Sequence, residues 1–156
     1  MTHDATAPAR HRPFPWLCAD CGACEVYPQA TDYTTTIKHD GAVYTIHVPD
    51  LELPTCRKCG EQLFTADNDD RVHAALREQA DLLSPENIRR ERERLRVTQQ
   101  ELAEHLGVSP ETVARWEAGG VIQSRALDNL LRLFFGSEEA RVLLQKRFNL
   151  ASRQAG

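Results

Sequence analysis

The pattern of apolar and polar positions is most regular in the C-terminal half of the chain, where it predicts two short helices joined by a tight turn. In the first helix, apolar residues recur at the spacing of one buried stripe, and Thr98 precedes them as a cap for the first free amides. Gly107 can take the left-handed backbone that follows many helix ends. Ser109, followed by proline, is a second start signal. We therefore expect helices over residues 99–106 and 110–118.

The second of these helices presents two different faces. Its predicted buried side consists of Val113, Ala114 and Trp116. The side chains expected to face outwards are Glu111, Thr112 and Arg115. Two helices joined by a short turn with glycine form the helix-turn-helix pattern, whose second helix enters the DNA major groove. An all-helical packing unit that never meets DNA is the alternative, because a fold does not fix a function.

Three more helices complete a predicted five-helix domain over residues 84–150. One begins near Pro85 and runs to Arg96, and its closely spaced arginines and glutamates can pair along the helix, at Glu86/Arg90 and Arg89/Glu93. That excess of arginine either contacts DNA phosphate or forms only a solvated face. The other two helices begin after Ser124 and Ser137, and each carries leucine and phenylalanine on one side.

Some apolar residues exceed what so small a core needs. They include Phe135, Val142 and Phe148, which we expect to form the interface of a homodimer, because a two-fold symmetric DNA site is bound by a dimer. Before this domain, residues 67–83 are expected to form a linking helix with a thin apolar stripe. The last residues, 151–156, are expected to form a tail.

The N-terminal half predicts a β-hairpin. Tyr33, Thr35 and Ile37 alternate with polar residues, and a second alternating run covers residues 43–48. Asp40-Gly41 between them suits a two-residue hairpin turn. Residues 1–15 show no periodicity and are expected to be a disordered arm, so this small domain spans residues 16–66.

Five cysteines lie in this domain, and two CxxCG units start at Cys18 and Cys56. Each unit places two thiolates on one side of a tight turn, and four such sulfurs match the shell of one structural zinc ion per chain. The predicted ligands are Cys18, Cys21, Cys56 and Cys59. Cys24 creates an alternative pair with Cys21, but only Cys18 and Cys21 are followed by a glycine as in the second unit. Cys24 is then a spare, half-buried thiol, and a redox use of the CxxC units is the other alternative.

Such a hairpin brings the two cysteine pairs together. The module has few large apolar side chains, so we expect metal binding to supply much of its folding free energy. His39 and His47 lie on the hairpin, and with four cysteines already placed we expect them to be strand residues and not ligands.

Composition restricts the location and the partners. The chain has 156 residues, of which 41% are hydrophobic and 27% charged, as in ordinary soluble proteins. No apolar run approaches the roughly 20 residues that span a bilayer, and the N-terminus has no apolar signal core. We therefore expect a cytoplasmic protein with no membrane partner.

The net charge of −4 divides unevenly between the two halves. Residues 1–83 contain 7 Lys and Arg against 13 Asp and Glu, whereas residues 84–156 contain 12 against 10. Only the C-terminal half has the sign that DNA phosphates attract. The acidic N-terminal half favours a basic protein partner or is merely a solvating surface.

These features together resemble a known family. The stretch TQQELAEHLGVSPETVARWEAG is similar to the Cro/cI-type (XRE) repressors. With the paired CxxC units, the hairpin ending in Cys59-Gly60-Glu61 and the linking helix, the chain resembles the MqsA-type antitoxins, with their YgiT-type zinc finger, over about residues 16–150. The resemblance implies an α+β fold, in which a small hairpin zinc-knuckle domain precedes a five-helix Cro/cI-like domain.

The resemblance also implies a function. In that family the zinc domain binds a small basic RNase toxin, and the helix-turn-helix domain dimerises on a palindromic operator and represses its own operon. By position, the zinc ligands are implied to be Cys18, Cys21, Cys56 and Cys59. The implied DNA-binding residues are Gln99, at a phosphate, and Ser109, Glu111, Thr112 and Arg115.

Three residues depart from the family pattern. Glu91 stands where the first helix usually has an apolar residue, and Arg96 stands where a glycine is common. Glu111 is acidic where a neutral donor is frequent, so it can accept a hydrogen bond from cytosine but repels phosphate. The operator sequence and the toxin therefore stay open.

The leading hypothesis is a dimeric, sequence-specific transcriptional repressor that serves as the antitoxin of a type II toxin-antitoxin system. The alternatives are a stand-alone zinc-containing regulator without a toxin and a CxxC redox protein. Ser, His and Asp show no catalytic pairing pattern, and no glycine-rich phosphate loop occurs, so we do not expect an enzyme.

Overall fold

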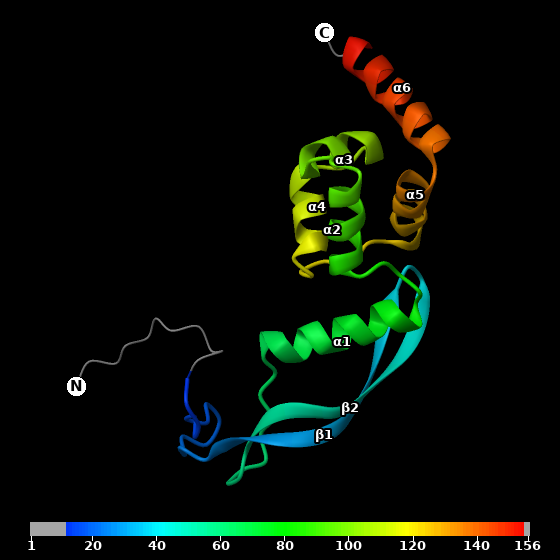
Figure 1. Ribbon diagram of the computed structural model, residues 1–156. Coiled ribbons are helices and arrows are strands. Elements are labelled where there is room, and N and C mark those ends of the chain that lie inside the picture. The colour runs from blue at the N-terminus through cyan, green and yellow to red at the C-terminus, as the bar shows by residue number, and fades with distance from the viewer. Residues whose placement is uncertain (1–11, 155–156) are drawn as a thin grey trace, which may run out of the picture. The chain divides into compact units, whose positions relative to one another are not determined.

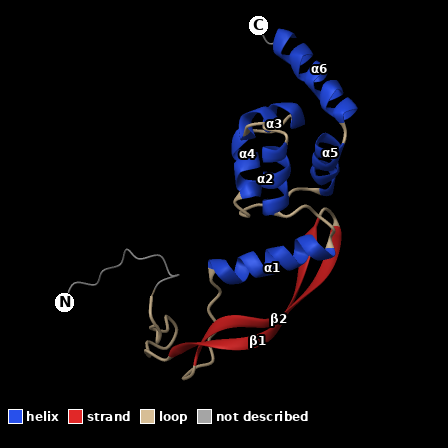
Figure 2. Ribbon diagram, viewed as in Figure 1, coloured by secondary structure: helices blue, strands red, loops and turns tan. Residues whose placement is uncertain are grey.

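The computed structural model describes residues 12–154, which form the α+β fold expected from the sequence (Figures 1 and 2). Two paired strands precede six helices in the described part of the chain. The strands are β1 (Val26–His39) and β2 (Ala42–Cys56), and the helices are α1 (Ala66–Gln79), α2 (Pro85–Arg94), α3 (Gln99–Leu106), α4 (Pro110–Glu117), α5 (Arg125–Gly136) and α6 (Glu138–Gln154). Residues 1–11 of the expected arm and 155–156 of the expected tail lie outside the described residues.

The described residues divide into two compact units. The first, which we call the cysteine unit, contains residues 12–36 and 45–75, and the second, the helical unit, contains residues 37–44 and 76–154. The division passes through α1 and through the hairpin. The hairpin turn therefore belongs to the helical unit, and each unit is described by itself below.

The hairpin turn lies at the predicted dipeptide. Asp40 and Gly41 have φ angles of 50° and 78°, and a two-residue turn of this kind requires positive φ at both positions. Within the helical unit, His39 Nε2 lies 3.1 Å from the carbonyl oxygen of Gln123. The Asp40 carboxylate accepts a hydrogen bond from the backbone N–H of Arg125. The turn is thus held at the first residue of α5.

The strands are longer than the alternating pattern predicted, at 14 and 15 residues. In β2, the buried residues include Ile46 and Val48 and then Leu51 and Leu53, so the alternation shifts by one residue. The shift coincides with Asp50, whose φ of 49° is left-handed, as in a bulge. Arg71 of α1 donates to the carbonyl oxygens of Asp50 and Pro49, at 3.0 and 3.1 Å. An arginine from α1 therefore supplies hydrogen-bond donors to the carbonyl groups at the irregular part of β2.

Helix α1 starts with a reciprocal cap and packs on β2 in the cysteine unit. The Asn68 side-chain oxygen accepts from the Thr65 backbone N–H at 2.9 Å, and the Asn68 backbone N–H donates to the Thr65 hydroxyl at 3.4 Å. The buried Asn68 amide also donates to the Glu52 carbonyl oxygen at 2.7 Å. The helix ends at Gln79, earlier than the expected residue 83, and the chain turns at Asp81 with φ of 49°.

The helix-turn-helix has the predicted boundaries to within one residue. Thr98 caps α3 and forms a capping box with Glu101, while Gly107 ends α3 with φ of 71°. Ser109 caps α4, which ends at Glu117. Helix α2 ends at Arg94, two residues before the predicted end, because Arg96 takes a left-handed φ of 57°. An arginine thus occupies a backbone conformation that favours glycine.

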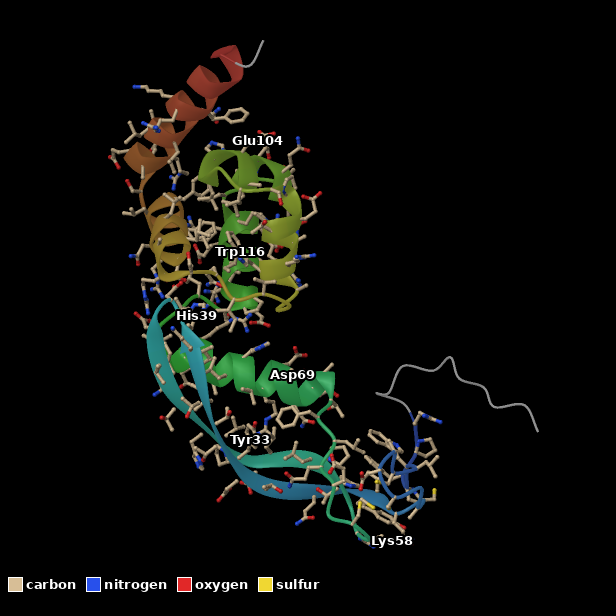
Figure 3. All side chains as sticks on the ribbon, turned by 180° about the vertical axis from the view of Figure 1, so that it is seen from behind. Tyr33, His39, Lys58, Asp69, Glu104 and Trp116 are labelled. Carbon is tan, nitrogen blue, oxygen red and sulfur yellow. The ribbon has the colours of Figure 1, made fainter. Side chains whose placement is uncertain are left out.

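The helices of the helical unit share a hydrophobic core. Trp116 lies among these helices (Figure 3). The fully enclosed core residues include Ile88, Leu102, Val113, Leu131 and Phe134. Phe135 is only 6% exposed and belongs to this core, so its assignment to a dimer interface is wrong. It turns inwards at the end of α5, where its ring packs edge-on against Phe134 at 5.8 Å.

Three large apolar residues of α5 and α6 face outwards. They are Leu133, Val142 and Leu143. Among the described residues, none of the helices combines the length and the apolar content needed to cross a membrane.

Candidate metal centre and nucleic-acid interface

Four cysteine sulfurs meet in the cysteine unit (Figure 3, sulfur in yellow). Cys18, Cys21, Cys56 and Cys59 place their Sγ atoms within 4.8 Å of one another. The Sγ atoms of Cys18 and Cys59 are 3.6 Å apart, and those of Cys21 and Cys56 are 3.7 Å apart. In a tetrahedron with metal–sulfur bonds of about 2.3 Å, the sulfurs lie about 3.8 Å apart. The four sulfurs are therefore spaced to hold a metal ion.

The two CxxCG units fold alike. The backbone N–H of Gly22 donates to the Cys18 carbonyl at 3.0 Å, and that of Gly60 donates to the Cys56 carbonyl at 2.8 Å. Both glycines have left-handed φ angles, of 68° and 81°. The trailing glycine thus closes each turn, which is why the sequence repeats it. The repeated geometry pairs Cys18 with Cys21, as the sequence pattern favoured.

Backbone amides favour the charged form of one sulfur. Hydrogen bonds from the backbone N–H groups of Cys59 and Lys58 lower the pKa of the Cys56 thiol to about 7, against an opposing effect of burial. The backbone N–H of Glu61 also lowers the pKa of the Cys59 thiol, but burial and the neighbouring thiols outweigh it and raise this pKa to about 12. Four adjacent thiolates repel one another, so a bound cation is needed to keep all four deprotonated.

Cys24 lies outside this cluster. Its thiol points to the carbonyl oxygen of Pro15, at 3.5 Å, and the residue is exposed, so the expectation of a half-buried thiol is wrong. The two hairpin histidines are strand residues, as expected. His47 Nδ1 lies 3.0 Å from the Thr34 hydroxyl, and His39 bonds to the backbone as described above.

A small apolar cluster supports the metal-ligating turns. The buried residue Val26 packs with Cys18 and Cys56, and Trp16 and Leu63 cover this cluster. The backbones of Trp16 and Val26 exchange two hydrogen bonds, of 3.0 and 3.2 Å. Since this core is so small, the sulfur cluster is the main link between the two turns.

Helix α4 presents the predicted DNA-facing residues on its solvent side. Glu111 and Arg115 are exposed, and Thr112 is half-buried. The Ser109 hydroxyl accepts from the Thr112 backbone N–H at 3.3 Å and lies 3.0 Å from the Thr112 hydroxyl. Hydrogen bonds from its own backbone N–H and from the Ser109 hydroxyl hold the pKa of the Glu111 carboxyl below its usual value. Glu111 and Ser109 thus cap the helix, whereas Arg115 extends from it.

The sequence reasoning missed a buried carboxylate at the end of α4. The Glu117 side chain is 2% exposed and accepts from Arg92 Nε and Nη2 at 2.6 and 2.9 Å. Gln99 donates its amide to the same carboxylate at 2.9 Å. Arg89 donates to the Glu117 backbone carbonyl at 2.9 Å. One carboxylate therefore ties α2 and α3 to α4, and it orients Gln99, a predicted phosphate contact.

This cluster shows what the arginines of α2 do. Arg89 faces Glu117, with 3.8 Å between Nε and Oε2, and Arg94 pairs with Glu91 at 2.8 Å. Arg90 faces Glu91 at 3.6 Å and Glu93 faces Arg92 at 3.8 Å, so these described residues pair differently from the expected Glu86/Arg90 and Arg89/Glu93. Burial by itself raises the pKa of the Glu117 carboxyl, but the hydrogen bonds from Arg92 and Gln99 and the charges of Arg92 and Arg89 outweigh it, so this pKa is lowered. The fold therefore favours the charged carboxylate.

The sequence contained one signal that Glu117 is buried and paired. It follows Trp116 and stands four residues after Val113, so it shares the buried side of the helix. A charged residue on such a side needs a partner of opposite charge, and the preceding helix is rich in arginine.

Comparisons with known proteins give a family for this chain. The chain matches the family model described as the antitoxin component of a bacterial toxin-antitoxin system, MqsA, over residues 16–139. The chain is also similar to the crystal structure of a candidate DNA-binding protein from Nitrosomonas europaea. The matched region covers 70% of this chain and 88% of that protein, with 17% sequence identity and a TM-score of 0.36. A search of the curated proteins found no match.

Proposed function

This chain belongs to the MqsA family of antitoxin components of bacterial toxin-antitoxin systems, and from that membership we propose that it is a dimeric, sequence-specific transcriptional repressor. The observation that carries this proposal is the single family match, which runs from the first cysteine turn through α5. The cysteine unit would bind a toxin, and the helical unit would bind a palindromic operator. Both roles are those of a cytoplasmic regulator that acts by binding and not by catalysis.

The proposed metal is one structural zinc ion per chain, held by Cys18, Cys21, Cys56 and Cys59. Four sulfur ligands at tetrahedral spacing, without an open position, are typical of structural zinc. When bound, the ion supplies a covalent-strength link between the two turns and no redox chemistry. The chain adds backbone hydrogen bonds in the second turn, where the N–H groups of Cys59 and Lys58 favour the thiolate of Cys56.

The proposed DNA interface is the solvent side of α4 with the start of α3. Arg115 would contact base edges in the major groove, with Thr112 and Glu111 beside it, and Gln99 and Ser109 would contact phosphates. The helix caps formed by Ser109 and Glu111 fix α4 for this contact. Dimerisation would supply the two-fold symmetry that a palindromic operator needs.

Replacement of Arg115 by alanine tests the interface. We expect Arg115→Ala to weaken binding to the DNA upstream of this gene by about 1–3 kcal/mol and to relax its sequence preference, because a bidentate arginine both binds and discriminates. Lys146→Ala, which removes an exposed positive charge from α6, should leave sequence preference unchanged. The measurement is binding to parent and base-substituted DNA at one salt concentration. Equal affinity and preference in Arg115→Ala and the parent would refute the assignment.

The toxin is tested by co-expression. We expect a small basic protein encoded next to this gene to co-purify with the full, metal-loaded chain and to be identified by mass spectrometry. The acidic balance of the N-terminal half supports a partner of that charge. If the neighbouring genes encode no such partner while the chain still binds its own upstream DNA, the protein is instead a stand-alone regulator.

A further inference from the structure

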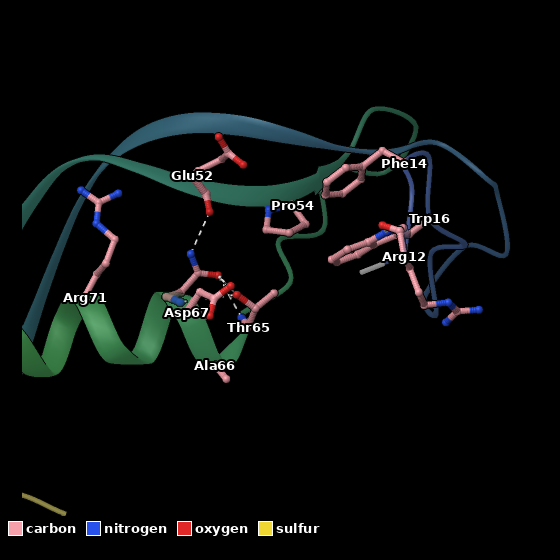
Figure 4. Close-up of a pocket in the computed structure, with 10 residues that line it drawn as sticks. Arg12, Phe14, Trp16, Glu52, Pro54, Thr65, Ala66, Asp67 and Arg71 are labelled. Atoms are coloured by element: carbon pink, nitrogen blue, oxygen red, sulfur yellow. Dashed lines mark hydrogen bonds between the residues drawn. The ribbon is translucent and has the colours of Figure 1, made fainter. Parts of the chain in front are cut away.

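The pocket beside the start of α1 in the cysteine unit is lined by charges of both signs (Figure 4). It has a volume of about 410 Å³, and Glu52 and Asp67 line it together with Arg12 and Arg71. Its lining therefore favours neither a cationic nor an anionic occupant. The outer face of α6 in the helical unit, by contrast, separates the two signs of charge along the helix.

Two contacts determine which side of α6 faces the core of the helical unit. Leu144 packs against the core cluster. The Arg141 guanidinium donates to the backbone carbonyl oxygen of Phe134 at 2.8 Å, near the end of α5. The opposite side of α6 faces solvent, and its exposed residues include Glu139, Val142, Leu143 and Lys146. We call these four residues the outer stripe of α6.

The centre of the outer stripe is apolar. Val142 is 49% exposed and Leu143 is 61% exposed. With Glu139 and Lys146 they have the three- and four-residue spacing of a single helix face. One exposed apolar side chain needs no explanation, but two adjacent ones in the middle of an ordered stripe favour a contact with another protein surface.

The two ends of the outer stripe carry opposite charges at equal distances from its centre. Glu139 stands three residues before Val142, and Lys146 stands three residues after Leu143. When a second α6 runs antiparallel, with a two-fold axis between positions 142 and 143, Glu139 of each copy lies opposite Lys146 of the other. A parallel pair would place like charges opposite each other. The outer stripe is therefore complementary to itself in the antiparallel orientation.

We propose that the outer stripe of α6 is a dimer interface, whose occupant is the outer stripe of a second copy in antiparallel orientation. Val142 and Leu143 of both copies form its apolar centre, and two pairs of Glu139 with Lys146 flank it. The inference rests on the dimer of the proposed function and adds which surface joins the copies. The family match ends at residue 139, so it does not supply this surface. Because the contact is smaller than a standard interface, we expect a weak dimer that two DNA half-sites reinforce.

Charge reversals test the interface and its orientation. We expect Glu139→Lys and Lys146→Glu each to weaken the dimer about tenfold or more, because each variant places two pairs of like charges across the interface. The double variant Glu139→Lys/Lys146→Glu should recover the parent dimer. An equimolar mixture of the two single variants should form a heterodimer, because every pair across the interface then has opposite charges.

The measurement is sedimentation equilibrium of the full, metal-loaded chain over a range of concentrations. Glu78→Lys, which reverses an exposed charge on α1, is the control and should keep the parent dimer. The signal of the buried Trp116 indole checks that each variant keeps its core. Lys146→Ala, the control for sequence preference above, should lower DNA affinity only through a weaker dimer and keep the preference among bases.

The outcomes separate this interface from the proposed function. If the parent is a dimer and all variants dimerise equally, the outer stripe is not the interface, and the inference fails while the dimeric repressor stands. If the single variants dissociate but neither the double variant nor the mixture recovers a dimer, the antiparallel orientation is wrong. If the parent is a monomer both free and on its upstream DNA, the inference and the dimeric part of the proposed function fail together.

Discussion

Cys56→Ser should abolish metal binding and unfold the two cysteine turns, while the helical unit keeps its core. Removing one ligand from a closed four-sulfur site removes most of its affinity, and structural zinc contributes about 10 kcal/mol or more to folding in small modules. The core beside the site is too small to replace that contribution, since only Val26 is buried there besides two of the ligands. The measurements are metal content per chain and the indole signals of Trp16 and Trp116.

Cys24→Ser is the matched control for this substitution. Cys24 follows Cys21 by three residues and has the same chemistry, but its thiol points to a backbone carbonyl and not to the cluster. We expect it to keep about one metal ion per chain and the parent stability. Loss of metal from Cys24→Ser, or retention of metal and fold in Cys56→Ser, would contradict the site.

The sequence predicted those features that depend on residues close together in the chain. Thr98 and Gly107 start and end α3 through contacts within one helical turn, so their residue types alone placed the helix. The dipeptide Asp40-Gly41 placed the hairpin turn in the same way, since its φ angles are a local property. The two CxxCG turns also fold locally, and the hairpin between them brings their sulfurs within reach.

The features that were missed depend on distant residues. Pro49 would normally end a strand, but β2 continues because Arg71, more than 20 residues later, bonds to the carbonyls at the irregularity. Phe135 looked available for a dimer, yet its burial depends on how α5 packs, which no local pattern contains. Glu117 finds Arg92 and Arg89 only after α2 and α4 come together, so the pair expected between Arg89 and Glu93 competed with a partner 28 residues away.

Glu117→Gln should destabilise the helical unit by about 3 kcal/mol or more. The substitution keeps the shape of the side chain but leaves Arg92 as a largely buried charge without its anionic partner, and breaking such a pair costs about 3–5 kcal/mol. The measurement is the free energy of unfolding of the metal-loaded chain in denaturant, followed by the Trp116 signal. Glu91→Gln is the control, because its pair with Arg94 is more exposed and contributes much less. Similar small losses in both variants would show that the Glu117 cluster does not hold α4.

The pH dependence of this difference identifies the carboxylate as its source. The pKa of Glu117 is lower in the fold than in the unfolded chain, where a glutamate has a pKa of about 4.3. Its ionic contribution is therefore fully present above about pH 4.3 and is lost as the pH falls through the lowered value. The advantage of the parent over Glu117→Gln should then be constant between about pH 5 and 7 and shrink below about pH 4. Other carboxylates with lowered pKa, such as Glu101, titrate in both proteins and cancel in the comparison. An advantage that stays constant down to pH 3 would mean that the shape of the side chain, and not its charge, holds α2, α3 and α4 together.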